Sequence, residues 1–120
     1  MASAPKDVIA VDLDGTLAEY HGFKGHEHIG EPIEPMLERV KGWLSEGKRV
    51  IIHTARAHDP KAIPPIRKWL KQHLGQELPV TDRKDPRAKE FWDDRAVTVQ
   101  KNTGKILTKG VKAKARAMSV

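Results

Sequence analysis

The sequence predicts an α/β fold of three layers, in which a Rossmann-like, mainly parallel central sheet carries helices on both faces. Apolar runs at 8–11 and 50–52 have the character of strands that are buried on both faces. Between and after these runs, apolar residues recur at steps of three and four, as they do in amphipathic helices. Strands that alternate with helices along the chain favour parallel pairing.

Glycine and proline punctuate the expected elements. Gly47 and Gly75 have the position of glycines that end helices, and the paired Pro64 and Pro65 are tolerated only in the first turn of a helix. The strands are expected at 8–13, 48–54, 78–81 and 90–92, the helices at 33–47 and about 64–74, a helical turn at 87–89, and a terminal hairpin between 96–100 and 105–107.

Composition limits the classes of function. The 120 residues suffice for one domain, which we expect to span 1–108, followed by a basic C-terminal tail at 109–120. The chain has no cysteine, which excludes disulfides and thiolate metal sites. No apolar run approaches the roughly 20 residues of a membrane span, and no signal peptide is evident before the first strand. We therefore expect a soluble, cytoplasmic protein with no membrane partner.

The net charge of +6 belongs to the end of the chain. Five of the 22 basic residues and none of the 16 acidic residues lie in 105–120, so positions 1–104 are close to neutral. Such a tail is either a solvated terminus or a guide that brings a polyanion to the protein.

The most specific pattern is Asp12-Leu-Asp-Gly-Thr16, directly after the first apolar run. Residues two apart in a strand point to the same face, so Asp12 and Asp14 should emerge together where the strand ends. Gly15 lets the chain turn away. Because two neighbouring carboxylates repel, they require a cation or a proton between them. The full pattern disfavours the simpler interpretation, a strand followed by an ordinary Asp-Gly turn.

This motif resembles the signature of the haloacid dehalogenase superfamily of phosphohydrolases, and the chain is similar to a small member of that family. The resemblance implies that Asp12 is the nucleophile, which takes the phosphoryl group as an aspartyl-phosphate, and that Asp14 is the general acid/base. It also implies a Mg²⁺ ion bound by the Asp12 carboxylate and the backbone carbonyl of Asp14, since magnesium prefers oxygen ligands.

The resemblance implies a phosphate-binding hydroxyl at the end of the next strand, where Thr54 stands. Its hydroxyl and the backbone N–H groups that follow, at Ala55 and Arg56, are expected to bind phosphoryl oxygens. Thr16 is a further candidate for substrate binding. The Arg56 side chain contacts either the phosphate or a partner in a surface ion pair.

The family also uses a lysine that neutralises the nucleophile and the transferred phosphoryl group. Lys84, just beyond the expected strand at 78–81, is the preferred candidate. Lys89 is the competitor, because it lies nearer to the final acidic pair in the sequence.

That acidic pair, Asp93-Asp94, follows the expected strand at 90–92. Adjacent aspartates are expected to point in different directions, so one would bind Mg²⁺ while the other orients water or Lys84, with Asp93 narrowly preferred as the metal ligand. The alternative is a solvated acidic turn paired with nearby arginines.

No cap domain is expected. Many relatives carry one after the first strand or before the last acidic motif, but the gaps here hold only about fifteen and eight residues. The site should therefore be open, or closed by a neighbouring subunit of a homo-oligomer. The first gap carries His21, His26 and His28, which bind a transition metal, contact substrate or lie free in a loop. The three tryptophans are expected in the core.

Together these features predict a magnesium-dependent phosphomonoesterase. The open site and the basic tail favour a polynucleotide 3′ end as the substrate, and a sugar phosphate or a nucleotide is the alternative. Two non-catalytic alternatives are a phospho-acceptor module, which Asp14 disfavours, and a nucleic-acid-binding protein with a degenerate phosphatase fold.

Overall fold

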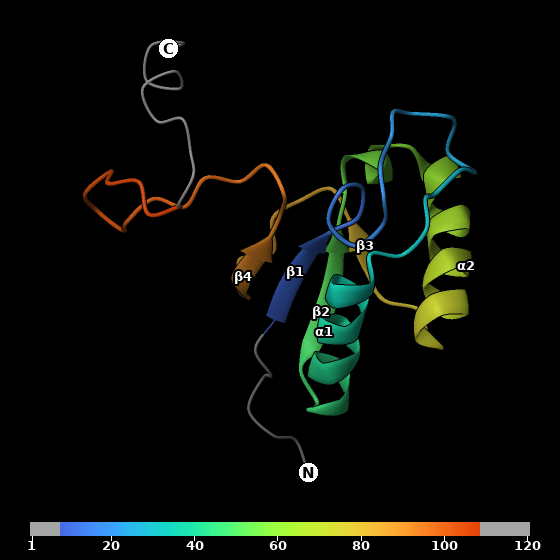
Figure 1. Ribbon diagram of the computed structural model, residues 1–120, viewed down its shortest axis with the longest axis horizontal. Coiled ribbons are helices and arrows are strands. Elements are labelled where there is room, and N and C mark those ends of the chain that lie inside the picture. Colours follow the sequence, from blue (N-terminus) through green and yellow to red (C-terminus); the bar gives the residue numbers. More distant parts are fainter. Residues whose placement is uncertain (1–7, 109–120) are drawn as a thin grey trace.

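The computed structural model describes residues 8–108, and its centre is a four-stranded parallel sheet (Figure 1). The strand order is β3-β2-β1-β4, and all three strand pairs are parallel. The strands are β1 (Val8–Asp12), β2 (Arg49–His53), β3 (Val80–Thr81) and β4 (Ala88–Trp92). The predicted α/β class with a parallel sheet is confirmed.

Helix α1 (Glu34–Ser45) joins β1 to β2, and helix α2 (Ile63–Leu74) joins β2 to β3. Both begin with proline in the first turn, and Gly75 ends α2 with a left-handed φ of 79°, as its position in the sequence predicts. Two short 3-10 helices, η1 (Ala55–His58) and η2 (Pro60–Ala62), lie between β2 and α2 and were not predicted, since such short turns carry no periodic pattern.

Two local predictions near the C-terminus need correction. The helical turn at 87–89 is wrong, because β4 already begins at Ala88. Asp85 instead forms a turn with Arg87, whose backbone N–H and guanidinium both donate to its carboxylate. The predicted hairpin is reduced to one antiparallel bridge between Val99 and Ile106. The predicted tail at 109–120 lies outside the described residues.

Both helices lie on one face of the sheet. A single core joins the α1 and α2 side chains to the strand residues that point to this face, which are Ile9, Val11, Val50 and Ile52. In the described part of the chain, no helix covers the opposite face, where Val8, Ala10 and Ile51 pack with Ala88. There the prediction of helices on both faces differs from the structure.

The topology explains this difference. The crossovers from β1 to β2 and from β2 to β3 move across the sheet in the same direction. Because both are right-handed, both place their helix on the same face. The chain then returns past β2 and β1 to reach β4, so this connection must cross the opposite face. It has only the six residues 82–87, too few for a helical crossover, and part of it lies beside Arg49 and Ile51.

The sheet brings the candidate residues to one edge. Asp12 ends β1 level with His53 of β2, and Trp92 ends β4 level with Val11. Asp93 and Asp94 therefore follow β4 just beyond the tip of β1. This is the carboxyl edge of the strands, where ligands of parallel sheets bind.

The tryptophans serve the core, as expected. Trp69 is buried in it, and Trp43 and Trp92 pack against it and against each other, with 5.1 Å between their ring centroids. Among the helices of residues 8–108, none is both long enough and apolar enough to span a membrane.

Candidate active site

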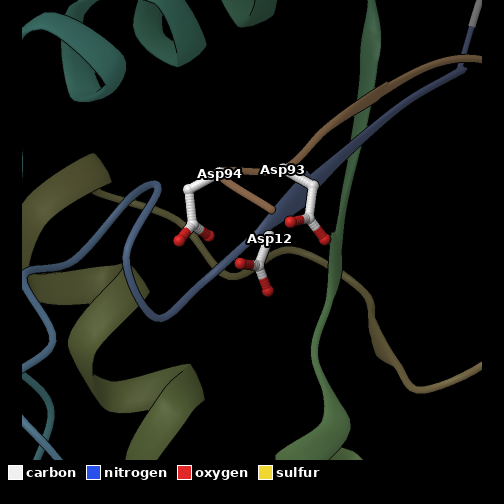
Figure 2. Close-up of side chains that lie close together, drawn as sticks. All are labelled: Asp12, Asp93 and Asp94. Atoms are coloured by element: carbon white, nitrogen blue, oxygen red, sulfur yellow. The ribbon is translucent and has the colours of Figure 1, made fainter. Parts of the chain in front are cut away.

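Three carboxylates meet at the tip of β1. Asp12, Asp93 and Asp94 each offer an oxygen that lies within 4.8 Å of the other two. Figure 2 shows Asp93 and Asp94 reaching from the chain after β4 toward Asp12. The prediction that the adjacent aspartates point in different directions is wrong, because both reach Asp12. How they divide the roles of metal ligand and water-orienting residue stays a prediction. The term acidic cluster refers below to these three residues.

The acidic cluster requires a proton or a cation. Two unit charges 4.8 Å apart repel by about 3–4 kcal/mol at an effective dielectric constant near 20. Burial, followed by the charges of Asp93 and Asp94 and a hydrogen bond with Asp94, raises the pKa of Asp12 to about 7. Among residues 8–108, no lysine or arginine forms an ion pair with any member of the cluster. An all-oxygen donor set of this kind fits Mg²⁺.

Gly15 and Thr16 position Asp94. Gly15 has a φ of +88°, and a Cβ atom there would lie 2.8 Å from Oδ2 of Asp94. The Thr16 hydroxyl oxygen accepts a hydrogen bond from the backbone N–H of Asp94 at 3.0 Å. The same hydroxyl donates toward Oδ1 of Asp94, 3.1 Å away, and Oδ2 of Asp12, 3.4 Å away. Gly15 and Thr16 thus connect the ends of β1 and β4. The Thr16 hydroxyl, a candidate for substrate binding, has its hydrogen-bond partners within the protein.

Asp14 lies outside the acidic cluster and pairs with Arg56. Nε of Arg56 donates to Oδ2 of Asp14 at 2.7 Å, and Nη2 donates to Oδ1 at 2.9 Å. The two alternatives for Arg56 were a phosphate contact and a surface ion pair. The structure shows an ion pair, but a buried one, since the Arg56 side chain is only 7% exposed.

Arg56 also anchors the loop 18–32 that follows β1. Its Nη1 donates to three backbone carbonyls of this loop, those of Gly25, His26 and His28, at 3.0–3.4 Å. The guanidinium lies 5.5 Å from the ring centroid of Phe23. From the other side, Nε2 of His26 bonds to Asp59 at 3.1 Å. Sequence reasoning missed these contacts, because nothing local to Arg56 marks a partner some 30 residues away.

Thr54 caps η1 where β2 ends. Its hydroxyl oxygen accepts the backbone N–H of Arg56 at 3.2 Å, which leaves the hydroxyl proton to donate elsewhere. Thr54 is buried and lines a pocket of about 550 Å³ together with Asp12, Asp14 and Ala55. We call this the nucleophile pocket, after the role that the sequence resemblance implies for Asp12. Its remaining lining residues are Tyr20, Phe23, His26, Arg56, His58, Asp94 and Arg95.

Both candidate lysines lie on the other side of Asp12. Lys84 and Lys89 line a second hollow of about 510 Å³, to which Asp12 and Asp93 also contribute. Nζ of Lys84 lies 5.5 Å from the ring centroid of Phe91. The structure therefore brings both lysines to the hollow beside Asp12 and does not choose between them. We call this the lysine hollow.

The three loop histidines do not gather into a metal site. His21 faces Glu19 at 3.5 Å, and His26 bonds to Asp59. Within residues 8–108, the only group of three or more side chains placed to share a metal ion is the acidic cluster.

Comparison with known proteins agrees with the fold. A solved structure of a conserved protein from Bacteroides thetaiotaomicron is similar to this chain, with 25% sequence identity and a TM-score of 0.59. The likeness covers 96% of this chain and 93% of that one. No protein-family model and no curated protein matches the sequence. Any function of this chain must therefore be argued from the geometry of its site.

Proposed function

We propose that this protein is a magnesium-dependent phosphomonoesterase that works through an aspartyl-phosphate on Asp12. One observation carries the proposal. Asp12 belongs both to the acidic cluster, which is suited to a cation, and to the nucleophile pocket, which also holds Asp14 and Thr54. A carboxylate nucleophile needs these same neighbours: positive charge, a group that transfers protons and a donor to the phosphoryl oxygens.

The proposed reaction has two displacements. A carboxylate oxygen of Asp12 attacks phosphorus, the bond to the leaving oxygen breaks, and Asp14, which enters this step in its protonated form, gives its proton to that oxygen. Water then attacks the aspartyl-phosphate, Asp14 accepts its proton, and inorganic phosphate leaves with Asp12 restored. Each Asp14 oxygen keeps a lone pair beyond its bond to Arg56, so Asp14 can carry the transferred proton while Arg56 stays bound. The free hydroxyl proton of Thr54 is suited to bind a phosphoryl oxygen.

The acidic cluster fits the metal that this chemistry uses. Asp12, Asp93 and Asp94 would bind Mg²⁺, together with the backbone carbonyl of Asp14. Bound there, Mg²⁺ neutralises the carboxylates and the charge of the phosphoryl group. Lys84 is proposed to balance the remaining negative charge from the lysine hollow, and Lys89 is the alternative.

The preferred substrate, a polynucleotide 3′ end, remains a prediction, as do closure of the site by a second copy of the chain and a cytoplasmic location. The basic tail that favours a polynucleotide lies outside the described residues. A sugar phosphate or a nucleotide is the alternative substrate. A phospho-acceptor module would accept phosphate on Asp12 without releasing it, so turnover separates that module from an enzyme.

The test is release of inorganic phosphate from a panel of phosphate esters, with Mg²⁺ present and with Mg²⁺ chelated. We expect turnover only with the metal, and an acid-stable phosphoprotein trapped at Asp12. Asp12→Asn should lose both signals, and Asp14→Asn should slow both formation and hydrolysis of the intermediate. Asp82→Asn is the matched control, because Asp82 is exposed and lies outside both cavities. Full activity of Asp12→Asn would refute the scheme.

A further inference from the structure

We infer that the substrate carries a planar aromatic ring, of the size of a nucleobase, which stacks on Tyr20 and Phe23 in the nucleophile pocket. This inference rests on the proposed phosphatase activity and names the class of its substrate. It follows from where the leaving group must lie and from the side chains that meet it there.

The position of Asp14 sets the direction of the leaving group. Two cavities share Asp12, but only the nucleophile pocket is also lined by Asp14 and Thr54. The leaving oxygen must lie within hydrogen-bond reach of the group that protonates it. If Asp14 has that role, the rest of the substrate extends into the nucleophile pocket and away from the lysine hollow.

The nucleophile pocket has two aromatic lining residues, Tyr20 and Phe23, which we call its aromatic wall. They are 46% and 58% exposed, and both belong to the loop that follows β1. The imidazoles of His26 and His58 and the methyl group of Ala55 add further flat or apolar surface. A volume of about 550 Å³ exceeds the needs of a phosphoryl group alone and lies within the usual range for small-molecule sites.

The Phe23 part of this wall is organised before a ligand binds. The guanidinium of Arg56 lies 5.5 Å from the Phe23 ring centroid, and the His26 ring meets the Phe23 ring edge-on at 5.3 Å. Arg56 also binds three carbonyls of the loop. A wall that is already ordered lowers the entropy lost on binding. An aliphatic sugar phosphate would gain little from it, whereas a planar ring gains stacking.

The experiment compares esters with and without a ring. The values of kcat/KM are measured for nucleoside 5′- and 3′-monophosphates and for ribose 5-phosphate and glycerol phosphate. We expect at least a roughly tenfold preference for the esters that carry a ring. Tyr20→Leu and Phe23→Leu keep apolar bulk, and each should lower that preference about tenfold, the usual effect of removing a base-stacking side chain.

Phe91→Leu is the matched control. Phe91 is 44% exposed but lines the lysine hollow, so its replacement should leave the preference ratio unchanged whatever it does to the absolute rate. A change in the ratio equal to that of Tyr20→Leu would overturn the inference. A 3′-phosphorylated oligonucleotide in the panel distinguishes the two sources of the ring: faster turnover than the free nucleotide assigns a polynucleotide end, and slower turnover assigns the mononucleotide.

A binding measurement separates this inference from the proposed function. Titration calorimetry of the Asp12→Asn variant with a nucleoside monophosphate and with ribose 5-phosphate does not depend on turnover. Tighter binding of the nucleotide supports the ring subsite even if no ester is hydrolysed, in which case only the phosphatase proposal fails. Hydrolysis of all esters with equal kcat/KM, together with equal binding, overturns the ring subsite and leaves the phosphatase proposal intact.

Discussion

Arg56 binds both oxygens of Asp14 with two of its nitrogens and binds the loop 18–32 with the third. One buried guanidinium therefore joins the proposed acid/base to the wall of the nucleophile pocket. The Asp14 carboxylate cannot itself bond to the carbonyls that Arg56 binds, because both groups are acceptors. Its effect on that part of the loop therefore passes through Arg56.

Arg56→Ala should lower the free energy of unfolding by about 3 kcal/mol, since removing one partner of a buried ion pair leaves the other charge uncompensated. Arg67→Ala is the control. The Arg67 guanidinium is 56% exposed and lies 3.9 Å from Glu77, so its loss should lower the free energy of unfolding by less than about 1 kcal/mol. Urea unfolding measures both. Equal effects of the two substitutions would contradict a structural role of the buried pair.

Asp14→Asn should loosen the loop 18–32 although the substituted side chain has no direct bond to the carbonyls that Arg56 holds. Arg56 loses a charged partner in this variant, and its hold on the carbonyls of Gly25, His26 and His28 should weaken. Amide hydrogen exchange should therefore become several-fold faster across residues 23–28 and stay unchanged in α2, which serves as the internal reference. Unchanged exchange in the loop would show that the two sites are independent.

The residues and elements that are marked by a local sequence pattern were predictable from the sequence. Asp12, Gly15 and Thr16 form one contiguous motif, and the period of the apolar residues predicted α1 and β2 to within two residues at each end. The contacts of Arg56 and the joint approach of Asp93 and Asp94 depend on how distant segments pack, which no local pattern records. The placement of both helices on one face likewise depends on the short connection 82–87. Its effect can be recognised only once the strand order is known.

Gly15→Ala should weaken Mg²⁺ binding as well as the fold. The φ of +88° strains any other residue, and the added Cβ would meet the Asp94 carboxylate at 2.8 Å. Gly22→Ala is the matched control, because Gly22 has a φ of +102° but nothing within 4 Å of its Cβ position. Both substitutions should lower the free energy of unfolding by about 1–2 kcal/mol, from backbone strain. Only Gly15→Ala should lower the Mg²⁺ affinity measured by calorimetry, and equal affinities in the two variants would contradict the role given to Gly15.

Lys84→Met should lower kcat about a hundredfold, and Lys89→Met should change it by less than about threefold. Both lysines line the hollow beside Asp12, so each serves as the control for the other. In the proposed reaction, the charge of the required lysine acts on the transferred phosphoryl group, so its removal should take away electrostatic stabilisation of the transition state. Steady-state kinetics at saturating Mg²⁺ measures the effect. The reverse ranking would assign the role to Lys89.

The stability of the metal-free protein should fall as the pH rises from about 4 to about 8. The pKa of Asp12 is about 7 in the folded chain and 3.8 as its ordinary value, so the folded state binds this proton more tightly. The stabilisation is complete below pH 3.8 and is lost as the pH rises through about 7. The difference between these two pKa values corresponds to about 4 kcal/mol, which partial exposure of Asp12 reduces to about 1–2 kcal/mol.

The difference in the free energy of unfolding between the wild type and Asp12→Asn isolates this contribution from the other titrating groups. Urea unfolding in the presence of a chelator should show the wild type losing about 1–2 kcal/mol relative to the variant between about pH 4 and pH 8. At the upper end of that range, Mg²⁺ at roughly a hundredfold excess over its Kd should stabilise the wild type by about 2.7 kcal/mol, because it binds the folded state where the proton has left. Parallel pH curves for the two proteins would contradict the raised pKa of Asp12. Equal stabilisation of both by Mg²⁺ would contradict the assignment of Asp12 to the metal site.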